Sequence, residues 1–288
     1  MKSREAVLAL AGWMVATHEG EGGLLEQLLA IKKHDIPKLK AIIKGEHPSS
    51  HQYPFTRGTG NYLNAMLDAW QLTNNTLWQT RIEKVLLATI HPADRISARG
   101  LSDAENAWSY LVLMQSIAKY LVIKHERSDY DACYSHAYHS FLHYARWMVN
   151  NEKPFMENPS QLEFPNDTWT AQDLRKAMLL FLAASFSPTE REFFNSKAED
   201  IFDYVLKKLK SSPEVEYSRI LIIVMQNHGP HSWKKNISTE PPEVINDGAK
   251  PVLSFSGLLL RISKRFWRGV VTFRPSRELS WLANRLEK

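Results

Sequence analysis

The chain has 288 residues, of which 44% are hydrophobic and 23% charged, a composition that predicts a substantial core and excludes an intrinsically disordered chain. Its single cysteine, Cys133, excludes an intramolecular disulfide framework and a cysteine-based metal cluster. The net charge of +5 is uneven, because residues 250–288 carry nine basic and two acidic side chains, or +7, which leaves −2 for residues 1–249. No apolar run reaches the length of about 18 residues that a membrane span needs.

Helices are predicted along the N-terminal part of the chain, because apolar side chains recur there at spacings of three and four. Lys2 and Arg4 precede an apolar run, as in a signal peptide, but Glu5 interrupts the basic region and no small-residue cleavage site follows. We therefore interpret residues 4–17 as an amphipathic helix and expect a cytoplasmic protein, in agreement with the single cysteine. Further helices are predicted for residues 24–33, 36–44, 59–73 and 76–89.

The central part of the chain has no glycine from Leu101 to His228, which disfavours β-hairpins and glycine-rich phosphate loops. Ser102 and Glu105 form a capping box, which predicts one long helix to about His125. The short connections predict antiparallel helical hairpins, so the expected fold class is all-α. Similar start signals predict helices from residues 128–131 to about 150, from 187–190 to about 210, and over residues 214–226.

Three of the predicted helices open in a similar way, with a loop followed by polar and aromatic residues. The three openings are residues 53–62, 101–110 and 164–173. Their irregular spacing disfavours a solenoid of fixed repeat and favours a ring or arc of hairpins. The openings are the most informative feature of the sequence, because each places amide, carboxylate and aromatic side chains at the start of a helix.

This pattern resembles the (α/α)-toroid, or six-hairpin glycosidase-like, superfamily. The resemblance rests on the openings with Tyr62, Trp108 and Trp169 and on residues 68–75, which look like a hairpin turn of such enzymes, and it covers roughly residues 50–230. In that superfamily the first turns of the inner helices meet sugars at the mouth of a funnel. The resemblance implies a carbohydrate-active or carbohydrate-binding protein that acts on a polysaccharide as a hydrolase, lyase or epimerase.

The resemblance and the uneven charge together set the expected domain organisation. Residues 1–235 are expected to form an (α/α) toroid or arc of antiparallel helical hairpins. A linker is expected over residues 236–251, and a basic amphipathic segment over residues 252–288.

Glycoside cleavage needs two carboxyl groups, one protonated as the acid and one ionised as the base or nucleophile. The predicted catalytic residues are Asp103, Glu163 and Asp173. Capping is the alternative role for acidic residues at helix starts, and it applies to Glu105 and Asp167. For Asp173 the alternative is an ion pair with a lysine three residues later on the same helix.

Aromatic and amide side chains at the openings have the chemistry of a sugar site, since sugar rings present apolar C–H faces and hydroxyl groups. Trp108 and Trp169 are predicted stacking platforms, with packing between hairpins as their alternative role. The predicted substrate-binding residues are Arg57, Asn61, Tyr62, Asn106, Trp108, Tyr110, Trp169, Gln172 and Lys176.

Three histidines, His136, His139 and His143, share one predicted helix face, and the last two have the spacing of a two-histidine metal clip. The glutamate of the metalloprotease motif is missing, so we interpret them as the outer face of a hairpin. We predict no metal and no cofactor.

The C-terminal segment predicts an amphipathic helix from about residue 253, with a stripe of phenylalanine and aliphatic residues on one side. Arg261, Lys264, Arg265 and Arg268 lie on the other side. Such helices bind anionic membranes, and the alternative is that the stripe packs onto the hairpin domain. Acidic polysaccharide and nucleic acid are less favoured, because the aromatic residues lie apart from the basic ones.

Two functional hypotheses follow. In the first, the helix openings bind or process a glycan and the basic segment contacts an anionic surface. In the second, the protein is a non-enzymatic helical scaffold that binds a protein partner or an anionic membrane through its C-terminal segment. Binding to a membrane would make this cytoplasmic protein membrane-associated.

Overall fold

The computed structural model describes residues 2–19, 23–45, 53–213, 215, 217–227, 229 and 255–286. These residues form helices, turns and loops with no strand among them, which confirms the predicted all-α class. No helix in the described part of the chain combines the length and the apolar character that a membrane crossing requires.

The chain divides into two compact units, one formed by residues 1–52 and 249–288 (unit 1) and one formed by residues 53–248 (unit 2). The predicted boundaries differ from this division, because residues 1–52 group with the C-terminal segment and not with the hairpins. Local patterns could not reveal a pairing between the two ends of the chain. The predicted linker, 236–251, lies outside the described residues.

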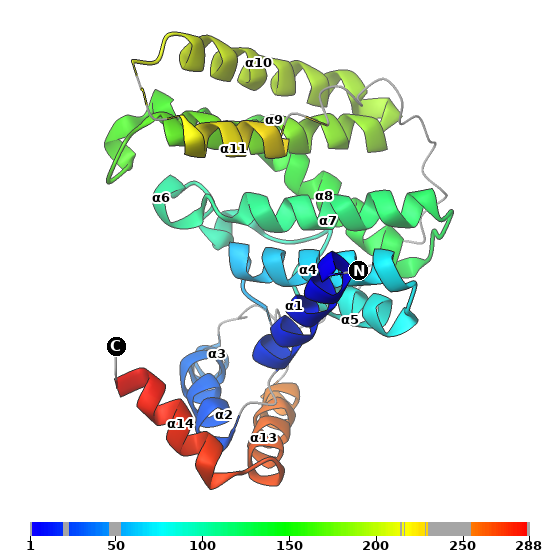
Figure 1. The fold of residues 1–288 in the computed structure, drawn as a ribbon, viewed down its shortest axis with the longest axis vertical. Helices are drawn as coiled ribbons and strands as arrows, with labels where there is room; N and C mark the ends of the chain where they lie inside the picture. Colours follow the sequence, from blue (N-terminus) through cyan, green and yellow to red (C-terminus); the bar gives the residue numbers. More distant parts are fainter. Residues whose placement is uncertain are drawn as a thin grey trace. The chain divides into compact units, whose positions relative to one another are not determined.

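Unit 2 consists of α-helices and short 3-10 turns (Figure 1), and capping side chains fix the starts of some of the helices. The side chains of Asn75, Asp131 and Asn166 accept hydrogen bonds from backbone N–H groups in the first turns of the helices that follow them. The α-helices are α4 (Arg57–Thr73), α5 (Thr76–Leu87), α6 (Ala104–Ala107), α7 (Tyr110–Glu126), α8 (Ala132–Asn151), α9 (Asp167–Phe186), α10 (Arg191–Lys210) and α11 (Ser218–Asn227). Short 3-10 turns are η2 (Ile96–Arg99), η3 (Phe155–Glu157), η4 (Pro159–Gln161) and η5 (Pro188–Glu190).

The predicted long helix after Ser102 is in fact two helices. Asp103, not Ser102, caps α6, because its side chain accepts a hydrogen bond from the backbone N–H of Asn106. The chain then turns at Trp108 and Ser109 before α7 begins. No glycine or proline in the sequence indicates this break. It turns the Trp108 side chain toward α9.

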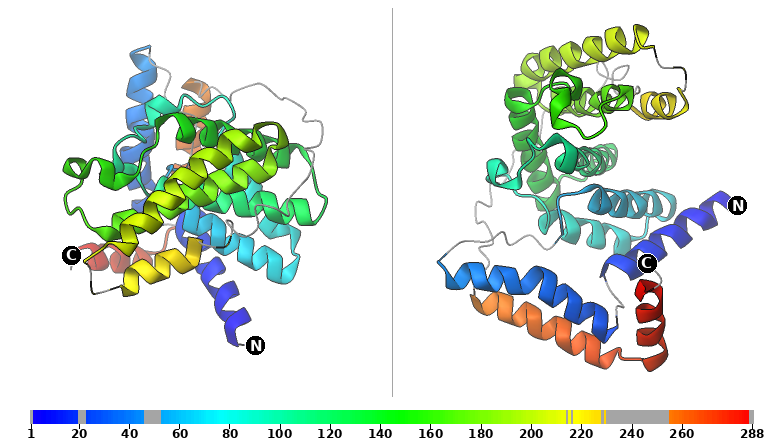
Figure 2. Two further views of the ribbon diagram at one scale, coloured as in Figure 1. Left: turned by 90° about the horizontal axis from the view of Figure 1, so that it is seen from above. Right: turned by 90° about the vertical axis from the view of Figure 1, so that its left-hand side faces the viewer.

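The helices of unit 2 pack in sequence order. α4 contacts α5 and α7, α7 contacts α8 and α9, and α9 contacts α10 and α11. In Figures 1 and 2, α4, α7 and α9 accordingly lie in neighbouring layers. α4 and α7 approach closely at Gly60, where a Cβ atom would lie 2.7 Å from the backbone nitrogen of Leu113. The core holds fully buried aromatic side chains such as Trp70, Phe141 and Phe181.

Unit 1 combines both ends of the chain. Its helices are α1 (Lys2–Glu19), α2 (Leu24–Ala30), the π-helical turn η1 (Ile31–Asp35), α3 (Ile36–Ile43), α13 (Phe255–Val271) and α14 (Pro275–Leu286). α13 packs against α2, η1 and α3, and the right-hand view of Figure 2 shows it beside them.

Three polar or close contacts hold unit 1 together. The buried carboxylate of Glu278, in α14, accepts hydrogen bonds of 2.9 and 3.0 Å from the backbone N–H groups of Leu24 and Leu25, which caps α2. Asp35 forms an ion pair with Arg265 at 3.0 Å. A Cβ atom at Gly269 would lie 3.1 Å from the Cα atom of Leu24, so glycine allows α13 to approach α2.

Candidate functional site

The three predicted openings meet at one end of unit 2. The rings of Trp108, after α6, and Trp169, in the first turn of α9, lie edge to face with centroids 6.0 Å apart, and both remain partly exposed. Arg57, at the start of α4, places its guanidinium carbon 5.9 Å from the centroid of the Trp108 ring. Glu105 accepts a 3.0 Å hydrogen bond from the backbone N–H of Glu163. One residue or more from each opening therefore contributes to a shared aromatic cluster.

A buried ionic network supports this cluster. The ammonium group of Lys176 lies 2.9 Å from carboxylate oxygens of both Asp173 and Glu152, and it donates a 2.6 Å hydrogen bond to the carbonyl of Lys153. It also lies 3.3 Å from the centroid of the Phe155 ring, which in turn contacts Trp169 with ring centroids 5.2 Å apart. The network fixes the segment between α8 and α9 against α9.

Asp173 belongs to this network and has no exposed surface. Besides its ion pair with Lys176, Asp173 accepts a 3.0 Å hydrogen bond from the backbone N–H of Phe155. Burial raises the pKa of Asp173 to about 6, although the charge of Lys176 acts in the opposite direction. Tyr110 completes the network by donating a 2.6 Å hydrogen bond to Glu152, and burial raises its pKa well above the ordinary tyrosine value.

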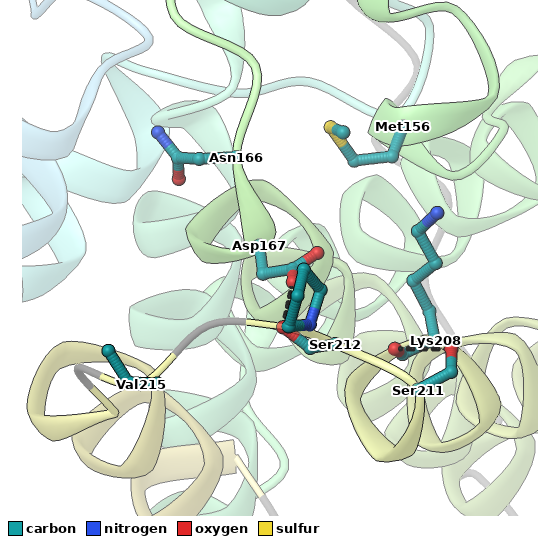
Figure 3. A pocket seen from close by; sticks show the side chains of 8 residues that line it. Met156, Asn166, Asp167, Lys208, Ser211, Ser212 and Val215 are labelled. Carbon is teal, nitrogen blue, oxygen red and sulfur yellow. Dashed lines mark hydrogen bonds between the residues drawn. The ribbon is translucent and has the colours of Figure 1, made fainter.

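A cleft of about 410 Å³ opens beside the start of α9. Its lining comes from the loop after α8, the first residues of α9, the end of α10 and the loop that follows α10. Figure 3 shows Asp167 hydrogen-bonded to Ser212, with Asn166, Met156 and Lys208 also lining the cleft. Asn166 and Asp167 immediately precede the aromatic cluster in the sequence, so the cleft and the cluster share the N-terminal end of α9.

The predicted site residues divide by exposure. The structure brings Arg57, Trp108 and Trp169 together at the surface. Asn61, Asp103, Asn106 and Glu163 are exposed as well. Tyr62, Tyr110, Gln172, Asp173 and Lys176 are buried; the Tyr62 ring lies against Tyr53, with centroids 6.3 Å apart.

Burial changes the roles that these residues can have. Tyr62 and Asp173 have no surface with which to touch a ligand in this conformation, and Lys176 is equally buried. Asp103 accepts hydrogen bonds from the backbone and side-chain nitrogens of Asn106, and these bonds lower its pKa below the ordinary aspartate value. A lowered pKa is the opposite of what a general acid requires.

Sequence reasoning missed the cleft. The sequence predicts Asp167 as a helix cap, but Asn166 is the cap, and Asp167 instead accepts a hydrogen bond from Ser212. Lys208 carries no sequence signal, because it is one of several lysines near the end of an ordinary amphipathic helix. Only the packing of α10 on α9 brings these groups together.

The histidine face of α8 ties this helix to the loop between α5 and α6. Nε2 of His136 lies 2.8 Å from the carbonyl oxygen of Ile90, and Nε2 of His143 lies 2.8 Å from that of Asp94. Within the described residues no group of three or more histidine, cysteine, aspartate or glutamate side chains is arranged to hold a metal ion.

The four basic residues predicted to contact an anionic surface also differ in exposure. Arg261 and Arg265 face the buried carboxylate of Asp35, at 3.8 and 3.0 Å, so they are partly buried by packing within unit 1. Lys264 and Arg268 are exposed. The face of α13 that packs is therefore centred on Leu258 and Gly269; Leu258 belongs to the predicted apolar stripe, whereas the phenylalanines of that stripe are exposed.

Comparisons with protein-family models, with curated proteins and with solved structures found no match for this chain.

Proposed function

We propose that unit 2 is a glycan-binding domain whose ligand occupies the end of the unit formed by the aromatic cluster and the adjacent cleft. The observation that carries the proposal is the meeting of Trp108 and Trp169, two partly exposed indole rings from separate openings, at 6.0 Å. Exposed aromatic surface held by a buried network is suited to the C–H face of a sugar ring, because it is rigid and loses little entropy on binding.

The cleft supplies the polar part of the proposed site. Its volume of about 410 Å³ lies within the range of about 300 to 1,000 Å³ typical of small-molecule sites. Asn166, Asp167 and Lys208 provide a donor amide, an acceptor carboxylate and an ammonium group. Such a mixture is suited to the hydroxyl groups of a saccharide, since each hydroxyl both donates and accepts hydrogen bonds.

Binding is favoured over catalysis by the state of the carboxyl groups. Asp173 is sequestered by Lys176 and Phe155, and Asp103 is held by Asn106. Of the three predicted catalytic residues, only Glu163 then keeps a carboxyl group that is free of these contacts. Both retaining and inverting glycosidases need two positioned carboxyl groups. We therefore propose a carbohydrate-binding role without glycoside cleavage.

We also propose that the hairpins of unit 2 form an open arc. The support is that α4, α7 and α9 are packed in sequence order, each with a partner helix (α5, α8 and α10). In such an arc the starts of successive inner helices lie at the same end, which accounts for the convergence of the three openings.

Isothermal titration calorimetry with soluble oligosaccharides, one set neutral and one set containing uronic acids, tests the binding proposal. We expect Trp169→Ala to weaken binding roughly tenfold or more, as removal of a central aromatic contact does, and Trp169→Phe to retain part of the affinity. Asn166→Ala with Lys208→Ala should weaken binding through the polar side of the cleft.

The matched control is Trp78→Ala, because Trp78 is also partly exposed but lies on α5. Equal affinities of the Trp169→Ala and Trp78→Ala proteins would contradict the assigned site. Failure of both oligosaccharide sets to bind the unaltered protein would contradict the function itself.

A further inference from the structure

α13 has three sectors, and only one of them packs within unit 1. Leu258 and Gly269 are buried against the N-terminal helices, and Arg261 and Arg265 flank this sector on the side of Asp35. On a helix of 3.6 residues per turn these positions occupy a single side. Two further sectors, one apolar and one basic, face outward.

The apolar sector exposes an unusually large number of apolar side chains to solvent. Among the described residues of unit 1, Leu258 is the one large apolar side chain that is buried. The exposed ones include Phe255, Leu259, Phe266, Trp267, Val270 and Phe273, and Trp267 is 63% exposed. Contiguous apolar patches of this kind mark sites of interaction with a membrane or another protein.

The outward basic sector borders the apolar one. Lys264 and Arg268 are exposed on α13, and Arg274 is exposed directly after it. From residue 255 to residue 277 the sequence contains six basic residues and no acidic residue. A protein partner would need a complementary acidic surface around an apolar groove, whereas an anionic bilayer supplies both features at once.

We propose that α13 docks on an anionic membrane surface, with Phe266 and Trp267 inserted at the boundary between head groups and acyl chains. Lys264, Arg268 and Arg274 then lie at the level of the anionic head groups. The ion pairs of Asp35 with Arg261 and Arg265 hold the packed sector against η1, so the apolar sector is presented outward before binding. Aromatic and leucine side chains opposite basic ones are the composition of interfacial helices.

Co-sedimentation of the full chain with vesicles tests this proposal. The probes are vesicles of phosphatidylcholine alone and vesicles of phosphatidylcholine mixed with phosphatidylserine. The unaltered protein should sediment with the mixed vesicles and much less with the neutral ones. Changing Phe266→Glu and Trp267→Glu together should reduce the partition coefficient on mixed vesicles at least roughly tenfold, because apolar burial is lost.

Charge reversal tests the electrostatic part separately. Lys264→Glu with Arg274→Glu should weaken partition on mixed vesicles by roughly tenfold or more while leaving the low affinity for neutral vesicles unchanged. The matched controls lie in unit 2: Leu77→Glu, at an apolar position that is 69% exposed, and Lys207→Glu with Lys210→Glu, at two exposed lysines. A thermal melt of each variant establishes that it is folded.

The proposal is overturned if the unaltered protein stays in the supernatant with mixed vesicles. It is also overturned if the unit 2 controls lose as much partition as the α13 variants, since binding would then follow overall charge or overall apolar surface. If a protein partner or unit 2 covered the apolar sector instead, the unaltered protein would stay in the supernatant with mixed vesicles.

Discussion

Unit 2 surrounds Lys176, one of its buried lysines, with two carboxylates and an aromatic ring inside a large apolar core, whereas unit 1 uses the buried carboxylates Asp35 and Glu278 with few buried apolar side chains around them. In unit 2 the buried charges position side chains at a surface site. In unit 1 they join segments from the two ends of the chain. Large apolar side chains of unit 1, such as Trp267, are exposed.

The contrast shows that amphipathic pattern alone does not decide which face of a helix packs. α13 has an obvious apolar stripe, but its packed sector is defined by a glycine, one leucine and two arginines facing an acid. Close approach at Gly269 and charge pairing select that sector, and the stripe remains on the surface.

The largest expected effect concerns Lys176, a buried lysine of unit 2. Lys176→Ala leaves Asp173 and Glu152 without their cation, and loss of one partner from a buried ion pair costs about 3 to 5 kcal/mol in the free energy of unfolding. The partly exposed ion pair of Lys119 and Asp68 gives the control, since Lys119→Ala should cost less than about 1 kcal/mol. Urea unfolding measures both, and similar losses would refute the structural role of the network.

The second effect compares the closest helix approaches of the two units. Gly60→Ala forces a Cβ atom onto the backbone of α7, so we expect a loss of about 2 kcal/mol or more. Gly269→Ala meets a less tight contact and should cost about 1 kcal/mol. At Gly12 the structure leaves open space, so Gly12→Ala should stabilise by up to about 1 kcal/mol through helix propensity. A different rank order in thermal or urea unfolding would contradict the assigned crossings.

The third effect concerns the cap that joins the ends of the chain in unit 1. Glu278→Ala leaves two backbone N–H groups of α2 without an acceptor, and we expect a loss of about 1 to 2 kcal/mol. Ser280→Ala, on the exposed side of the same helix, is the control. Gly23→Ala should act like Glu278→Ala, because its Cβ atom would overlap the Glu278 carboxylate. Circular dichroism during urea unfolding would show whether these two variants lose the same free energy of unfolding.

The smallest effect depends on pH. Hydrogen bonds of 2.7 and 2.6 Å from Arg146 lower the pKa of Glu190. A lowered folded-state pKa stabilises the protein above the ordinary glutamate value, near 4.5, and this contribution is lost as the pH falls through the lowered value. The pair is partly exposed, so Glu190→Gln should cost less than about 1 kcal/mol at neutral pH. That difference should shrink toward zero in acid, and a difference that grows in acid would contradict the pairing.

Local features of the structure could be predicted from the sequence. Helix starts followed from capping residues such as Asp131, and the glycine-free central region indicated the all-α class. The resemblance to the (α/α)-toroid superfamily implies that the openings lie at one end, and Arg57, Trp108 and Trp169 meet there. The capping signals lie within a few residues of the helix starts that they predict.

Features that depend on distant partners could not be predicted. Asp173 and Lys176 look like a surface pair three residues apart, and nothing local shows that Glu152 and the backbone of Phe155 enclose them. Asp35 and Arg265 are separated by 230 positions, so the grouping of the two chain ends into unit 1 had no sequence signal. The cleft likewise arises from the packing of α10 on α9.

Hydrogen exchange of the full chain, with and without phosphatidylserine-containing vesicles, tests the contrast between the two units most directly. Without vesicles, amides of α7 and α9 should exchange slowly and those of α13 quickly, because exchange protection follows buried apolar contact. With vesicles, α13 should become protected while α7 and α9 remain unchanged. Equal protection of the two units without vesicles, or no change in α13 with them, would contradict the account.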